Sequence, residues 1–150
     1  MAAVSLDRRL SRFVGSFAGP AADFASITWV MATILVVDDE AAMRVMLTFA
    51  LSADHTVLEA SNGQEGLAMF AQHQPALIIT DLHMPVMSGI AFVGQVRALS
   101  STVKIIAHAA FHNPSERAAI LQAGADLCLS KPANIIDLES AVATLLARSP

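Results

Sequence analysis

The stretch that decides the fold is ILVVDDE, residues 34–40. Four consecutive aliphatic residues precede three acids, although only 15% of the chain is charged. A short, uninterrupted apolar run of this kind is typical of a strand that is buried on both faces. The three acids therefore lie at the end of a buried strand. Neighbouring carboxylates repel one another, so their clustering there suggests a chemical role.

Short apolar runs and longer amphipathic stretches alternate from residue 33 onward. We expect strands over residues 33–37, 56–60, 76–80, 104–109 and 127–129, and helices over residues 41–52, 63–73, 89–99, 114–123 and 135–147. Pro114 opens the fourth helix and Gly124 ends it. Because crossovers between parallel strands are right-handed, five such units predict a doubly wound α/β domain, a five-stranded parallel sheet covered by helices on both faces.

Composition and charge narrow the function classes. The 150 residues suffice for one domain, and 55% of them are hydrophobic. Residues 33–150 contain six basic and eleven acidic side chains, so we expect no nucleic-acid partner. Cys128 is the only cysteine, which excludes an internal disulfide and is consistent with a cytoplasmic location. No apolar run reaches the roughly 18–20 residues of a membrane span, so we expect no membrane partner.

Residues 1–32 are interpreted as an N-terminal extension of a domain at 33–148. Arg8 and Arg9 resemble a twin-arginine signal, but glycine, proline and aspartate interrupt the apolar segment that follows. Two alternatives remain open: Met31 is the natural start, or the extension is a real appendage. In the second case its apolar residues, including Trp29, are expected to pack on the domain or on a neighbouring subunit.

Three carboxylates and one amine are expected at the same edge of the sheet. Asp38 and Asp39 follow the first strand, Asp81 follows the third, and Lys131 follows the fifth. The carboxyl ends of parallel strands meet at one edge, where doubly wound domains place their reactive groups. Clustered acids need a cation, and Mg²⁺ suits carboxylate ligands that also meet a phosphate. An aspartate there can attack phosphorus, while a lysine ammonium pairs with the phosphoryl group.

Residues 33–148 resemble the response-regulator receiver domain of two-component signalling. The resemblance rests on DDE at 38–40, DLHMPVMSG at 81–89 and SKP at 130–132. It implies a flavodoxin-like fold and phosphorylation of Asp81 by a sensor histidine kinase or a histidine phosphotransfer protein. It also implies that Mg²⁺ is held by Asp39, Asp81 and the backbone carbonyl of His83, with Asp38 acting through water, and that Lys131 contacts the phosphoryl group.

The chain departs from the family at two switch positions. Ala109 stands where receivers have a hydroxyl residue, and Cys128 stands where they have an aromatic residue. The phosphoryl-contact region is therefore expected to comprise Ala109, Ala110 and His83, without the hydroxyl. A hydrogen bond to a charged group is worth roughly 1.5–3 kcal/mol, so we expect a weakened switch.

Four side chains near the two switch positions have their own interpretations. By strand alternation His108 points away from the Ala109 face, as a satisfied core or groove histidine. His112 lies in the following loop, within possible reach of the site. His83 and Phe111 occupy positions that in receivers influence loss of the phosphoryl group, and the bulky ring of Phe111 leads us to expect slow self-dephosphorylation.

The output expected from the sequence is a protein contact. We expect a single-domain regulator that is not an enzyme beyond phosphotransfer onto Asp81, and that binds a downstream protein. The binding face would comprise the fourth helix, fifth strand and fifth helix, with Ile120, Leu121 and Cys128 available; a homodimer through this face is left open.

Other interpretations of the same residues are weaker. One is a receiver-fold binding module with little phosphorylation-coupled switching. A phosphatase of the haloacid dehalogenase type would need D-x-D-x-T or V, whereas the chain has DDEAA at 38–42. Asp39 or Asp81 alone would be interpreted as a helix cap, and Lys131 alone as a loop lysine.

Overall fold

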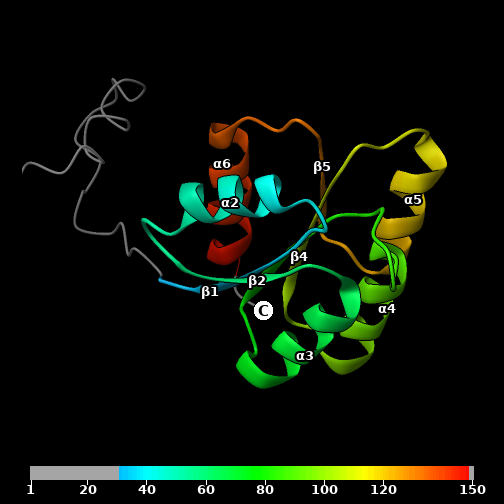
Figure 1. The fold of residues 1–150 in the computed structure, drawn as a ribbon, viewed down its shortest axis with the longest axis horizontal. Coiled ribbons are helices and arrows are strands. Elements are labelled where there is room, and N and C mark those ends of the chain that lie inside the picture. Colours follow the sequence, from blue (N-terminus) through cyan, green and yellow to red (C-terminus); the bar gives the residue numbers. More distant parts are fainter. Residues whose placement is uncertain (1–30, 149–150) are drawn as a thin grey trace, which may run out of the picture.

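The computed structural model describes residues 31–148 of the chain (Figure 1). Both interpretations of the N-terminal extension, and the expected packing of Trp29, lie outside these residues. Within them, no helix is long and apolar enough to cross a membrane.

The sheet is parallel and its strands follow the order β2-β1-β3-β4-β5. The strands are β1 (Thr33–Val37), β2 (Thr56–Ala60), β3 (Leu77–Thr80), β4 (Lys104–Ala109) and β5 (Leu127–Ser130). The helices are α2 (Ala41–Leu51), α3 (Gly63–His73), α4 (Gly89–Leu99), α5 (Pro114–Ala123) and α6 (Ile135–Ala147). The prediction of a doubly wound, flavodoxin-like domain is confirmed, with single-residue shifts at the ends of three elements.

Helices cover both faces of the sheet, as Figure 1 shows: α2 and α6 lie on one side, and α3, α4 and α5 on the other. Successive residues of β1 serve opposite layers, because side chains alternate along a strand. Ile34 and Val36 pack with the α2 and α6 layer, whereas Leu35 and Val37 pack with the α3, α4 and α5 layer. This double burial explains the uninterrupted apolar run at residues 34–37 of β1.

Polar side chains fix where four of the helices begin. The N-cap residues Asn62, Ser88, Asn113 and Asn134 accept backbone N–H groups in the first turns of α3, α4, α5 and α6. Gly124 ends α5 with φ of 126°, a conformation that side chains disfavour. Helix α2 differs, since its N-cap Glu40 makes no side-chain capping bond.

The apolar binding face expected on α5 and β5 is wrong in two of its three residues. Ile120 is fully buried and Cys128 is 8% exposed, because both side chains point into the layer beneath α5. Of the three, only Leu121 is exposed. The most exposed large apolar side chain of a described helix is instead Phe49 on α2, one turn after the exposed Val45.

Candidate metal centre and acceptor aspartate

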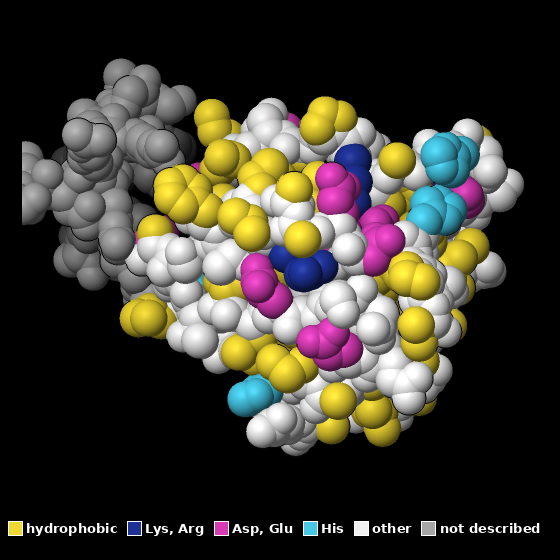
Figure 2. Space-filling view, viewed as in Figure 1, with side chains coloured by type: hydrophobic (Ala, Val, Ile, Leu, Met, Phe, Trp, Pro, Cys, Tyr) yellow, Lys and Arg dark blue, Asp and Glu magenta, His cyan; other side chains and the backbone are white. Residues whose placement is uncertain are grey.

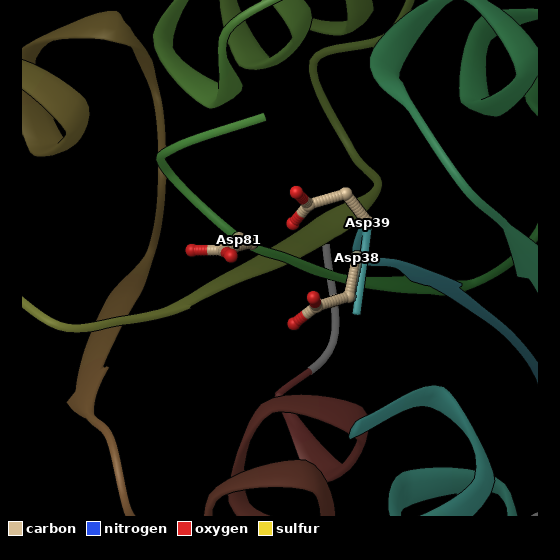
Figure 3. A group of neighbouring side chains, drawn as sticks. All are labelled: Asp38, Asp39 and Asp81. Carbon is tan, nitrogen blue, oxygen red and sulfur yellow. The ribbon is translucent and has the colours of Figure 1, made fainter. Parts of the chain in front are cut away.

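Three carboxylates converge at the carboxyl edge of the sheet. Asp38 follows β1 and Asp81 follows β3, and these strands are paired up to Val37 and Thr80, so both acids leave the sheet together. Asp38, Asp39 and Asp81 can each place one oxygen within 4.8 Å of the others. Figure 3 shows the three side chains turned toward a common space. Asp38 and Asp81 are buried, whereas Asp39 is exposed, so the space opens to solvent on the Asp39 side.

Lys131 neutralises the two buried acids. Its Nζ donates hydrogen bonds to Asp38 Oδ2 at 2.8 Å and to Asp81 Oδ2 at 3.0 Å. Burial alone would lower the pKa of Lys131, but the hydrogen bonds and charges of both aspartates outweigh it and raise that pKa. The Lys131 side chain is therefore a firmly held ammonium. Lys131 follows β5, and its ammonium lies between Asp38, which follows β1, and Asp81, which follows β3.

Backbone groups orient the same carboxylates. Asp38 Oδ1 accepts the Glu40 N–H at 2.9 Å, and Asp81 Oδ1 accepts the Leu82 N–H at 2.6 Å. These bonds lie within the turns that follow the strands. Because the N-cap residue of α2 is Glu40 and that of α4 is Ser88, neither Asp39 nor Asp81 caps a helix, and the capping interpretation is wrong.

Two contributors to the site were not identified from the sequence. The Arg44 guanidinium donates to the Asp38 carbonyl at 2.7 Å, and the buried Thr80 hydroxyl donates to the Asp81 carbonyl at 2.9 Å. Both bind backbone oxygens next to the acids. Arg44 lies six residues after Asp38, which is not a helical spacing, so the sequence offered no clear signal for the first contact, and Thr80 looked like an ordinary strand residue.

Gly89 lets the loop after Asp81 fold back on that residue. Its N–H donates to the Leu82 carbonyl at 2.8 Å. A Cβ at this position would overlap the Asp81 carbonyl oxygen and lie 2.8 Å from the Leu82 Cα. Only glycine allows this approach, because backbone atoms cannot move aside as a flexible side chain can.

The two switch positions lie in an apolar environment. Ala109 is fully buried at the end of β4, and Cys128 on neighbouring β5 joins the same apolar cluster. Burial raises the pKa of the Cys128 thiol, against a smaller opposite influence of Arg117. Ala110 is exposed, and the Ala109 carbonyl accepts the Lys131 N–H at 2.9 Å. Ala109 is therefore connected to Lys131 through a backbone hydrogen bond, and its side chain offers the site only a methyl group.

His108 is buried, as expected, but it is not satisfied. It is 1% exposed, and neither ring nitrogen has a hydrogen-bond partner within residues 31–148. Burial lowers the pKa of His108, and the Lys131 ammonium lowers it further, against Asp38 and Asp81, which raise it. A neutral imidazole thus lies close enough to the site to sense its charges.

The other residues near the two switch positions, His83, His112 and Phe111, lie at or near the protein surface. His83 and His112 are exposed, with ring centroids 5.1 Å apart. Phe111 is half-buried, and the Arg117 guanidinium lies 5.2 Å above its ring. No hydrogen bond or ion pair joins the His83 or His112 side chain to the three carboxylates within the described chain.

The donor set fits a hard divalent cation. All three converging side chains offer oxygen, the ligand atom that Mg²⁺ prefers, and the exposed side leaves room for the waters that this ion keeps. Asp39 makes no hydrogen bond or ion pair with another residue in the described range, so its carboxylate is available to a cation.

Comparison with known families settles which family this arrangement represents. Residues 34–143 match the family described as the response regulator receiver domain. The chain belongs to this receiver family. Receiver domains are generally not enzymes in their own right, and acids converging at this edge are typical of the family's Mg²⁺ site.

Curated relatives of this receiver chain are longer than it is. It is 40% identical over 119 residues to the KDP operon transcriptional regulatory protein KdpE of Escherichia coli, covering 79% of this chain and 52% of that protein. It is 38% identical over 117 residues to the response regulator MprA of Mycobacterium ulcerans, covering 77% and 50%. The chain therefore spans about half the length of these relatives.

Two solved structures share the fold over nearly their whole length. The chemotaxis protein CheY4 of Vibrio cholerae superposes with a TM-score of 0.73 at 32% identity, covering 77% of this chain and 99% of that one. A putative response regulator from Chloroflexus aurantiacus gives 0.74 at 31% identity, covering 79% and 100%.

Proposed function

We propose that this receiver domain accepts a phosphoryl group on Asp81 from a sensor histidine kinase or a histidine phosphotransfer protein. The observation that carries the proposal is the bridge from Lys131 to both Asp38 and Asp81 beside the open carboxylate of Asp39. In this arrangement the Asp39 carboxylate is open to solvent, and the Lys131 ammonium can pair with the phosphoryl group after transfer.

The transfer proposed here balances as a simple displacement. An oxygen of Asp81 attacks the phosphorus of a phosphohistidine, so that a P–O bond forms as the P–N bond breaks. The bonding electrons go to the imidazole nitrogen, which takes a proton from solvent. Asp39, Asp81 and the His83 carbonyl would hold Mg²⁺, with Asp38 acting through water, and the ion would offset the charge repulsion between carboxylate and phosphoryl oxygens. Lys131 gives up its hydrogen bond to Asp81 and pairs with the phosphoryl group, while its hydrogen bond to Asp38 is kept.

The acceptor role is tested by covalent labelling. With acetyl phosphate and Mg²⁺, the unmodified chain should gain about 80 Da by mass spectrometry, the mass of one added PO₃H group, in a bond that alkaline hydroxylamine cleaves. Asp81→Asn should gain nothing, because an amide cannot form the acyl phosphate. Glu139→Gln, which changes an acid on α6, serves as the matched control and should label normally. Equal labelling of Asp81→Asn would overturn the proposal.

The proposed output is a protein contact made by the receiver domain. The excess of acidic over basic side chains in residues 33–150, eleven against six, disfavours direct contact of this domain with a phosphate backbone. KdpE is by its name a transcriptional regulator, so control of transcription through an effector domain is the alternative output. Whether the receiver acts as a single-domain regulator stays a prediction.

A second candidate function is a binding module that keeps the fold but switches weakly. The methyl of Ala109 and the buried thiol of Cys128 favour it, because neither can make the contacts of a hydroxyl and an aromatic ring. Beryllofluoride with Mg²⁺ separates the two candidates. Amide shifts that reach α5 and β5 support switching, whereas shifts confined to the loops after β1 and β3 support the binding module.

A further inference from the structure

A second group of metal-binding side chains lies beside the carboxylate site but does not belong to it. His83 comes from the loop after β3, His112 from the loop after β4, and Glu116 from the first turn of α5. His83 Nε2 lies 3.4 Å from Glu116 Oε1, and the two imidazole centroids are 5.1 Å apart. Figure 2 shows histidine side chains gathered with an acidic one on this part of the surface.

Glu116 is held in place before any ligand arrives. Its Oε2 accepts the His112 N–H at 2.7 Å, while its own N–H donates to the N-cap Asn113 at 3.0 Å. This reciprocal arrangement resembles a capping box at the start of α5. One carboxylate oxygen is thus used to fix the helix start, and the other faces His83. Glu116 is therefore the fixed ligand of the cluster, and the exposed imidazoles of His83 and His112 are its other two ligands.

The spacing of the rings suits a shared ion. Zinc binds imidazole nitrogen at about 2.0–2.1 Å in tetrahedral geometry, which separates the centroids of two rings on one ion by roughly 5 Å. The separation of 5.1 Å between the His83 and His112 centroids agrees with this geometry. Within the described residues only the three aspartates already bring three ligand atoms within 4.8 Å, so the imidazoles must turn to complete the set. Both rings are exposed, and therefore free to turn.

The structure points to a transition-metal site, and we propose that His83, His112 and Glu116 bind a divalent ion of the Zn²⁺ class. Two imidazoles and one carboxylate favour Zn²⁺, Ni²⁺ or Cu²⁺, whereas the oxygen-only aspartate site favours Mg²⁺. The bound ion would tie the loop after β3 to the loop after β4 and to the first turn of α5. The inference does not depend on phosphorylation of Asp81.

Calorimetry on tag-free, metal-free protein tests the site. The background variant carries Asp39→Asn and Asp81→Asn, which removes the carboxylate site and leaves the histidines intact. Titration with zinc sulfate should show one equivalent bound, and magnesium chloride should show none. His83→Gln or His112→Gln should weaken zinc binding at least about tenfold, and Glu116→Gln should weaken it as well. His73→Gln, at an exposed histidine on α3, is the matched control and should bind as tightly as the background variant.

A measurement on the unmodified chain guards against damage caused by the variants. In its NMR spectrum, zinc should shift the imidazole resonances of His83 and His112 and leave those of His73 in place. The inference is overturned if zinc fails to bind the background variant, or if the His83 and His112 substitutions leave the affinity unchanged.

Discussion

His108 is the residue whose surroundings conflict most with its chemistry. A buried polar group without a hydrogen bond costs roughly 1–3 kcal/mol, and both nitrogens of this ring lack a partner within residues 31–148. The ring lies in β4, next to Ala109 and close to the charges of Lys131 and Asp38. The fold therefore carries a local penalty at the base of the site, in a strand whose other inward-facing residues are apolar.

Replacing His108 by Leu should stabilise the fold, and more so in acid. The pKa of His108 is lowered on folding, so the unfolded chain binds more protons below about pH 6.5 and stability is lost as the pH falls. Leu removes both this proton uptake and the unsatisfied nitrogens. We expect the free energy of unfolding in urea to rise by about 1–2 kcal/mol at neutral pH, with a larger gain near pH 5.5.

His55 is the natural control for this pH dependence, because burial also lowers its pKa. His55→Leu should lose the part of the acid sensitivity that His55 contributes and retain the part that His108 contributes. A loss of stability in His108→Leu that is equal at both pH values would mean that the ring makes favourable contacts and is not a source of destabilisation.

Helix α4 contains two glycines with opposite roles. Gly89 lies at its first residue against the Asp81 backbone, whereas Gly94 lies mid-helix, exposed, with nothing within 4 Å of an added Cβ. An alanine fits the second position without contact but not the first. The same substitution therefore tests tight packing at one end of the element and helix propensity at its centre.

Gly89→Ala should lower the free energy of unfolding by about 1–3 kcal/mol, because the loop must move away from Asp81. Gly94→Ala should raise it by up to about 1 kcal/mol, because alanine is the better helix former. Urea denaturation followed by circular dichroism measures both. If the two variants changed stability in the same direction, the close approach at Gly89 would not matter to the fold.

At the scale of the whole molecule, we expect the carboxylate site to link metal binding to stability. A ligand that binds only the folded state adds about 2.7 kcal/mol at a hundred times its dissociation constant. Magnesium should therefore raise the thermal midpoint of the unmodified chain, and EDTA should reverse the rise. In Asp39→Asn the rise should be lost, while the midpoint without metal should stay close to that of the parent, because Asp39 is exposed and makes no hydrogen bond or ion pair with residues 31–148.

Glu139→Gln is the matched control for this measurement, since it removes an acid from α6 and leaves the site intact. Its midpoint should rise with magnesium as that of the parent does. A magnesium response of normal size in Asp39→Asn would show that the ion binds elsewhere.

The sequence by itself determined the architecture and the membership of the acidic cluster. The signals were local ones that can be read along the chain: the apolar run of β1, the turn residues Pro114 and Gly124, and the acids at two strand ends. Asp38, Asp39, Asp81 and Lys131 could be grouped because parallel strands end at one edge of a sheet. That grouping needed topology alone.

Only the tertiary structure decided what each side chain contacts. The sequence suggested that Ile120 and Cys128 are exposed on an apolar surface, yet both side chains point into the core. The reason is that packing determines how a helix is rotated about its axis and which face of the sheet a residue of a short strand points to. His108 was expected to find a partner and has none among the described residues, and Glu116 was not connected with His83 until the loops were placed. Such contacts join residues that are distant along the chain, and their geometry follows from the assembled layers rather than from any local pattern.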